Sequence, residues 1–205
     1  MKRTAADLLA RLQASRLRIF TTADLRTLTG QAPAAAVHAL GRLEAQGLVA
    51  RVRRGVWANR LAPALNPGEA VVHLRTPWPA YVSLHSALAI HGLVAEIPHA
   101  TWAVTAAPPY RLESPLGAFR FHHLPSRLMW GYGMHRDGAA VYPLANPVKA
   151  FLDTMYLSLI PRSPVREPVR RGRRWDLDPA ILRPAARRFA FPPLMRRLAA
   201  LGFTA

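Results

Sequence analysis

The chain has 205 residues, a length that leaves room for one full hydrophobic core and a second small one. Hydrophobic residues make up 51% of it and charged residues 19%, a composition that excludes an intrinsically disordered protein. The formal net charge is +17, so the expected partner is an anion, either a nucleic acid or an acidic membrane surface.

The same composition bears on the cellular compartment. The chain contains no cysteine, which excludes disulfides and thiolate metal sites. Asp7 and Arg11 interrupt what would be the apolar core of a signal peptide, and no stretch reaches about 18 uninterrupted apolar residues. We therefore expect a cytoplasmic protein that is neither exported by that route nor membrane-spanning. Of the two anionic partners we expect nucleic acid and no membrane, on the position of the charges along the chain.

The charge is concentrated at the two ends of the chain. Residues 1 to 60 hold 11 Lys and Arg against 3 Asp and Glu, residues 61 to 157 hold 6 against 5, and residues 158 to 205 hold 11 against 3. A neutral middle between two basic ends predicts either two contacts with a polyanion or one contact plus a basic tail.

Two short helices are expected first. Residues 4 to 15 carry apolar side chains at helical spacing after Thr4, a possible N-cap. A second helix is expected to be capped by Thr22 and to end at Gly30.

A third helix is expected from Pro33, which suits a first helical turn, to Gly47. Its expected buried stripe consists of Ala36, Val37, Leu40 and Leu43. Its opposite face carries Ala34, Ala35, His38 and Arg42. In helix-turn-helix proteins such a face enters the major groove, where His and Arg reach base edges and Ala contacts thymine methyl groups. A merely solvated face is the alternative.

A basic β-hairpin follows, with the sequence LVARVRRGVWA over residues 48 to 58 and Gly55 in its turn. Arginines at such a turn either contact nucleic acid or keep an exposed edge strand soluble. Their position after the three helices is the order of a winged helix, which favours DNA. The residues expected to contact DNA are Lys2, Arg3, Thr22, Arg26, Ala34, Ala35, His38, Arg42, Arg51, Arg53, Arg54 and Gly55.

Pro63 and the Asn66-Pro67-Gly68 segment predict a linker, so the expected domains are residues 1 to 62 and 63 to 205. In the second domain a strand followed by a Gly-capped helix is expected over residues 81 to 93, and a further helix over 146 to 157. The other expected strands are 70 to 74, 101 to 105, 110 to 112, 118 to 122, 129 to 134 and 139 to 143.

The C-terminal part is expected to contain an extended, mobile basic connector, residues 161 to 174, and two helices, about 179 to 190 and 193 to 201. The fold class is therefore α+β: a winged helix-turn-helix followed by a mixed domain with β-hairpins and a basic helical end. The second set of expected backbone contacts with DNA is Arg162, Arg166, Arg170, Arg171, Arg173, Arg174, Arg187 and Arg188.

The sequence offers little support for catalysis. His85 and His91 do not share a helix face, and His122 and His123 point to opposite sides of a strand. The carboxylates are scattered, and no nucleophile elbow or phosphate-binding glycine loop occurs. We expect no enzyme, no metal and no cofactor, while a small site assembled across the hairpins remains open.

Two segments of the second domain carry a family resemblance. They are YVSLHSALAIHGL, residues 81 to 93, and ANPVKAFLD, residues 145 to 153. Together with the order of elements over residues 4 to 160, they resemble AbiEi-type antitoxins, the transcriptional regulators of abortive-infection toxin-antitoxin operons. The family's recurring Pro, Lys and helical Asp fall here on Pro147, Lys149 and Asp153. Lys149 and Asp153 are i, i+4 neighbours that can pair, so their expected role is structural.

The resemblance implies a winged helix that binds inverted repeats in its own promoter and represses the operon. It further implies self-association on DNA, and a nucleotidyltransferase-like toxin that is neutralised without a stable complex. The residues thus predict a sequence-specific DNA-binding repressor of the antitoxin type. Two rivals stay open: a protein- or RNA-interaction module with a basic tether, and a nuclease targeted by a winged helix.

Overall fold

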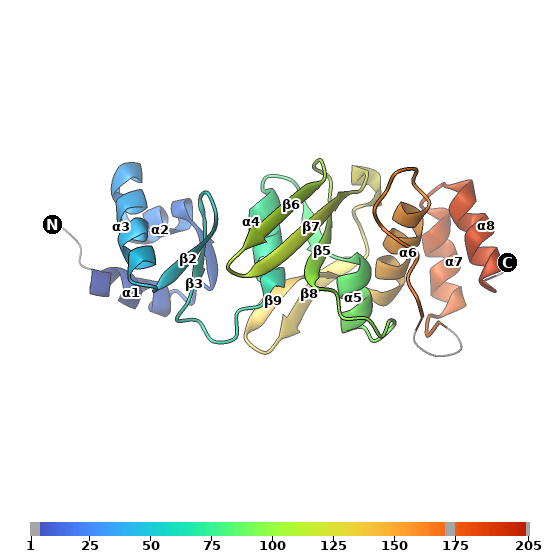
Figure 1. Ribbon diagram of the computed structural model, residues 1–205, viewed down its shortest axis with the longest axis horizontal. Helices are drawn as coiled ribbons and strands as arrows, with labels where there is room; N and C mark the ends of the chain where they lie inside the picture. The colour runs from blue at the N-terminus through green and yellow to red at the C-terminus, as the bar shows by residue number, and fades with distance from the viewer. Residues whose placement is uncertain (1–4, 171–174, 204–205) are drawn as a thin grey trace.

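The computed structural model describes residues 5 to 170 and 175 to 203. The molecule is elongated: the N-terminal helices and a three-stranded sheet lie at one end, a six-stranded sheet lies in the middle, and the last two helices lie at the other end (Figure 1). Both units contain helices and sheets with antiparallel hairpins, which confirms the expected α+β class.

The N-terminal unit has the element order of a winged helix. Its elements are α1 (Ala5–Ala14), β1 (Ile19–Thr21), α2 (Thr22–Thr29), α3 (Pro33–Ala45), β2 (Val49–Arg53) and β3 (Val56–Asn59). The three strands pair antiparallel in the order β1-β3-β2. Strand β3 of the wing hairpin therefore also pairs with β1, the strand that precedes α2. Strand β1 was not expected from the sequence, because three residues are too few to show an alternating pattern.

Local interactions explain the helix ends and correct two expectations. The N-cap of α2 is Thr21, not Thr22, because Thr21 and Asp24 form a reciprocal capping box. Gly30 ends α2 in the left-handed conformation, as expected. Val37 does not belong to the buried stripe of α3: its side chain is 50% exposed, since Ala36, Ala39, Leu40 and Leu43 already fill the buried face.

The small sheet has two buried faces. Phe20, Val49 and Trp57 pack with the three helices in a core of their own. Residues of the opposite face, among them Ile19 and Val56, belong to the larger core that includes α4 and the second sheet. The winged helix is therefore packed against the rest of the chain rather than tethered to it by a linker alone.

The second unit is built on a mixed sheet. Its first elements are η1 (Pro67–Ala70), α4 (Val71–Arg75), β4 (Ala80–Val82), α5 (Leu84–Ile90), β5 (Ala100–Thr105), β6 (Tyr110–Ser114) and β7 (Gly117–His123). They are followed by η2 (Ser126–Leu128), β8 (Tyr132–Asp137), β9 (Ala140–Ala145) and α6 (Pro147–Ser158). The strand order is β6-β7-β5-β4-β9-β8, with parallel pairs β5/β7 and β4/β9.

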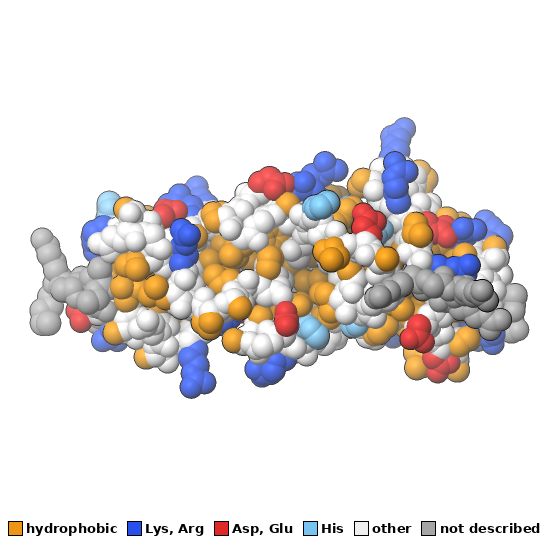
Figure 2. Space-filling model, turned by 60° about the horizontal axis from the view of Figure 1, so that its bottom comes forward, with side chains coloured by type: hydrophobic (Ala, Val, Ile, Leu, Met, Phe, Trp, Pro, Cys, Tyr) orange, Lys and Arg blue, Asp and Glu red, His pale blue; other side chains and the backbone are white. Residues whose placement is uncertain are grey.

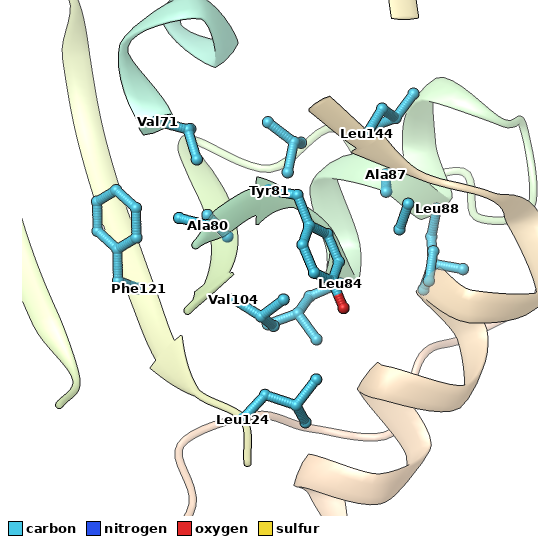
Figure 3. Close-up of a cluster of buried hydrophobic side chains, with 14 of the residues drawn as sticks. Val71, Ala80, Tyr81, Leu84, Ala87, Leu88, Val104, Phe121, Leu124 and Leu144 are labelled. Atoms are coloured by element: carbon cyan, nitrogen blue, oxygen red, sulfur yellow. The ribbon is translucent and has the colours of Figure 1, made fainter. Parts of the chain in front are cut away.

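Helices cover both faces of this sheet. On one face, Tyr81 of β4 donates a hydrogen bond to Asp153 of α6. The strand register places Phe121 of β7 on the opposite face. There its ring lies against Arg75 of α4. Figure 3 shows Tyr81, Leu84, Val104 and Leu144 in the apolar cluster between the sheet and the helices. The central sheet is thus enclosed between α4 and the helices α5 and α6.

The expected strand over residues 70 to 74 is wrong, because these residues form the end of η1 and most of α4. Asn66 and Glu69 make a capping box that starts a helical turn at Pro67. Val71 and Leu74 then lie on one buried face at helical spacing. A short run of β-branched residues does not distinguish a strand from a buried helix without such a cap.

The C-terminal part follows the expected order, with α7 (Pro179–Arg187) and α8 (Pro192–Ala200). Residues 161 to 170, the described part of the connector, contain no helix and make a single bridge to Val94. They are not uniformly exposed, since Val165 is buried in the main core and Glu167 pairs with Arg197.

Candidate nucleic-acid interface

The exposed face of α3 is the best-defined candidate surface. Ala34, Ala35, His38 and Arg42 are all exposed there, opposite the buried stripe. No hydrogen bond or ion pair of the His38 or Arg42 side chain is found among the described residues. Pro33 in the first turn fixes the start of the helix, and α2 packs across α3 as the other helix of the motif. Small side chains beside two free polar ones can lie close to another macromolecule.

Thr22 and Arg26 of α2 differ in how free they are. Arg26 is exposed, whereas the Thr22 hydroxyl accepts a hydrogen bond from the Trp57 indole, with 3.0 Å between Nε1 and Oγ1. This bond fastens the start of α2 to the wing. Lys2 and Arg3 lie outside the described residues.

The three wing arginines have different environments. Arg51 lies over the Trp57 ring, 4.9 Å from its centroid, with Glu44 3.9 Å away. Arg53 is half-buried, and its Nη2 donates to the backbone carbonyl of His73 in α4 at 3.2 Å. Arg54 is exposed next to Gly55, which takes the positive φ of 81° that the turn requires. Arg54 is therefore the free basic side chain at the tip of the wing, while Arg53 anchors the wing to the second unit.

The C-terminal arginines lie at the opposite end of the molecule from α3 (Figure 1). Arg162, Arg166, Arg170, Arg187 and Arg188 are exposed, and Arg171, Arg173 and Arg174 lie outside the described residues. Several basic groups at this end have partners within the fold, which leaves fewer free charges than the sequence count suggests. The Arg188 guanidinium lies 3.9 Å from the Trp130 ring centroid, and Arg197 makes two hydrogen bonds to Glu167.

Lys149 and Asp153 form a buried ion pair, as their spacing predicted. The Asp153 carboxylate also accepts hydrogen bonds from Tyr81 (3.0 Å) and Ser83 (2.9 Å). Burial raises the pKa of Asp153 and lowers the pKa of Lys149, and their mutual attraction opposes both shifts. Gly131 packs so closely on Lys149 that a Cβ there would lie 3.1 Å from its side chain. This cluster is enclosed by the core.

The histidines do not form a reactive group. The ring of Trp102 lies between His85 and His122, with centroid distances of 5.3 and 5.0 Å. Burial, aided by nearby Arg111 and His85, lowers the pKa of His122 to about 4. His91 and His123 make hydrogen bonds with backbone carbonyl groups. Within residues 5 to 170 and 175 to 203 there is no group of three or more His, Asp or Glu side chains that could hold a metal ion.

One ion pair between the two units was missed by the sequence analysis. The Arg18 guanidinium makes two hydrogen bonds to Glu69 and two more to the carbonyls of Pro63 and Ala64. The capping box at Asn66 could have located Glu69, but nothing local points to a partner 51 residues away.

Among the described residues, the exposed polar face of α3 and the exposed arginine at the tip of the wing are arranged as in a winged helix. Residues 7–60 match the family model of the AbiEi antitoxin transcriptional regulators. The AbiEi resemblance is therefore confirmed over this quarter of the chain, which contains the winged helix apart from the first two residues of α1. The segments at residues 81 to 93 and 145 to 153 lie outside the matched range.

No curated protein matches the chain significantly. None of the helices in the part of the chain that the structure describes is long and apolar enough to cross a bilayer.

Proposed function

We propose that this protein is a sequence-specific DNA-binding repressor that autoregulates an antitoxin operon. The observation that carries the proposal is that the residues matching the AbiEi regulators are those that present α3 and the wing. That match supports an antitoxin-type transcriptional regulator. Repression of its own promoter is what the AbiEi resemblance implies, and we propose it on that basis.

In the proposed complex, α3 enters a major groove. His38 and Arg42 reach base edges while Ala34 and Ala35 allow close approach, so this face supplies specificity. Arg54 and Arg51 contact phosphates or the adjacent minor groove, and Arg26 of α2 contacts the backbone. These phosphate contacts supply affinity that falls with salt.

We further propose that residues 1 to 62 act as the DNA-binding domain and residues 63 to 205 as a supporting domain. The exposed arginines near α7 and α8 lie at the opposite end of the long axis from α3 (Figure 1). In the proposal they contact the DNA phosphate backbone away from the site that α3 occupies. Two copies on an inverted repeat would place these basic ends along one duplex, which is why self-association on DNA belongs to the proposal.

The remaining proposals concern partners. A nucleotidyltransferase-like toxin, neutralised without a stable complex, is the expected functional partner of such an antitoxin. The protein itself acts in the cytoplasm without cofactor and without catalysis. The Lys149 and Asp153 pair supports the last point, because both side chains are fully buried and no substrate could reach them.

The test is binding of the purified protein to labelled fragments of its own upstream region, with scrambled competitor, over a series of salt concentrations. We expect a preference of about a thousandfold for its own promoter, with an affinity that decreases as salt rises. A reporter under the same promoter should be repressed by the protein.

Two results would contradict the proposal. Equal affinity for every fragment, with a steep dependence on salt, would mean that the positive charge binds nucleic acid without regard to sequence. That result would favour the protein- or RNA-interaction module. Metal-dependent cleavage of the fragments would favour the nuclease.

A further inference from the structure

A cavity of about 820 Å³ lies where the winged helix meets the second unit. One wall comes from the end of α1 and the loops around β1 and β3, and the other comes from α4 and the β8/β9 hairpin. Its volume is in the range of small-molecule sites, and a position between two packed units is a common place for them.

The β8/β9 hairpin turns an apolar face into this cavity. Met134 and Arg136 of β8 pair with Pro143 and Val141 of β9, so the four side chains share one face of the hairpin. Met134 is 69% exposed and Val141 36% exposed. An edge hairpin that only met water would carry polar side chains on this face.

The facing wall continues the apolar surface. Leu61 is 46% exposed and Val72 is 37% exposed, and both line the same cavity. Four of the large hydrophobic side chains that the described residues leave exposed therefore meet at one place. Figure 2 shows hydrophobic side chains reaching the surface between the two ends of the molecule. Such gathering distinguishes a binding surface from singly scattered apolar residues.

The charges around the cavity select the sign of a ligand. Glu69 is the one carboxylate among the lining residues, and it is already neutralised by Arg18. Arg16 and Arg136 also line the cavity, and neither side chain has a hydrogen bond or ion pair among the described residues. Two free guanidinium groups beside an apolar surface complement an anion with an apolar body.

We propose that this cavity binds a small organic anion, a carboxylate carried on an aliphatic or aromatic body, with Arg16 and Arg136 holding the carboxylate. Because the cavity touches both units, an occupant changes how the winged helix is held against α4 and β8/β9. Binding is thereby coupled to DNA affinity, a regulatory consequence that rests on the proposed repressor function.

The test is titration of the full chain with sodium decanoate. Binding is measured by isothermal titration calorimetry, below the concentration at which decanoate forms micelles. Decanol serves as the uncharged probe of the same length. We expect decanoate to bind at one site per chain, and decanol to bind at least about tenfold more weakly because it lacks the charge-assisted contacts.

Variants locate the site. Arg136→Glu and Met134→Asp should each weaken decanoate binding by about tenfold or more. Arg136→Glu replaces a positive charge by a negative one, and Met134→Asp places a negative charge, like that of decanoate, on the apolar face. Arg111→Glu and Ile97→Asp are matched controls, exposed and outside the cavity, and should bind decanoate like the parent protein. Equal binding by all four variants would overturn the site.

Two further outcomes separate this site from the proposed function. If light scattering shows a dimer that Met134→Asp converts to a monomer, a second copy of the chain covers the surface and the ligand proposal is wrong. Saturating decanoate should shift affinity for the protein's promoter about threefold or more in the parent protein and not in Arg136→Glu. If decanoate binds but promoter affinity is unchanged, the regulatory coupling alone is wrong. If the protein does not bind its promoter at all, the proposed repressor function is wrong, and the calorimetry still tests the ligand site.

Discussion

The winged helix and the second unit both contain charged residues, but they place them differently. On α3 and at the wing tip, Arg42 and Arg54 are exposed and have no ion pair among the described residues. In the second unit, Lys149 is buried against Asp153 and Arg197 is held by Glu167. The charge of Arg42 and Arg54 is therefore available to a partner, whereas the charges of Lys149 and Arg197 are paired within the fold.

The net charge of a region does not show how many of its charged groups are free. The two ends of the chain carry equal excess charge in the sequence, yet Arg188 at the C-terminal end stacks on Trp130 and Arg197 at the same end is paired with Glu167. A guanidinium that stacks on a ring contributes to packing as well as to the electrostatic field. Counting arginines therefore overestimates the free charge of a region whose arginines contact other residues of the chain.

The largest effect should come from breaking the buried pair. Asp153→Ala leaves the Lys149 ammonium uncompensated and deprives Tyr81 and Ser83 of their acceptor. We expect the free energy of unfolding to fall by about 3–5 kcal/mol in urea titrations. The matched control is Glu113→Ala, which removes a carboxylate paired with Arg120 on the surface and should cost under about 1 kcal/mol. Equal losses in the two variants would erase the contrast between buried and exposed charge.

The next effect concerns the free charge of α3. Arg42→Ala and His38→Ala should each weaken binding to the protein's promoter by about 1–3 kcal/mol while leaving binding to scrambled DNA nearly unchanged. Their urea midpoints should match that of the parent protein, because both side chains are exposed. Fluorescence anisotropy with the two DNA fragments measures the effect, and a uniform loss on both fragments would show that α3 does not read sequence.

A pH dependence tests the packed histidine rings. The pKa of His122 in the folded state is about 4, below its ordinary value, so the unfolded chain takes up the proton first as pH falls. The free energy of unfolding should therefore decrease between about pH 6.5 and 4, by about 1–2 kcal/mol after allowance for partial exposure. His122→Phe keeps a ring against Trp102 and should have a shallower slope. An unchanged slope would mean that His122 is not held neutral by burial.

The smallest effect separates two neighbouring arginines. Arg54→Ala should weaken binding to every DNA fragment and reduce the slope of log affinity against log salt by about 1. Arg53→Ala should leave that slope nearly unchanged and instead lower the unfolding free energy by about 1 kcal/mol, because its hydrogen bond to His73 is lost. If the two variants lost salt dependence equally, both arginines would contact DNA.

Much of the fold could be predicted from the sequence wherever local signals agreed. Asn146 and Pro147 located the start of α6, and Gly55 located the turn of the wing. Residues 70 to 74 were assigned to the wrong element, since two β-branched valines suggested a strand while the deciding cap lay upstream at Asn66. Local propensity fails where a short segment obtains its conformation from its neighbours.

The candidate site was predictable in part, for a related reason. Helical periodicity places His38 and Arg42 on an exposed face without knowledge of the tertiary structure. It does not reveal that Arg53 bonds to α4, or that Arg18 of the first unit pairs with Glu69 of the second, because those contacts join segments distant in the chain. The division of arginines into free and engaged groups requires the packed structure.

In the proposed complex, α3 lies in the major groove of a specific operator. Because the chain has no cysteine, Val37→Cys on the flank of α3 gives a single attachment point for an iron chelate that cleaves nearby DNA by hydroxyl radicals. We predict cleavage confined to two half-sites of an inverted repeat in the upstream region, and none from the same reagent at Ile97→Cys. Cleavage spread evenly along the fragment, or equal from both positions, would contradict the account.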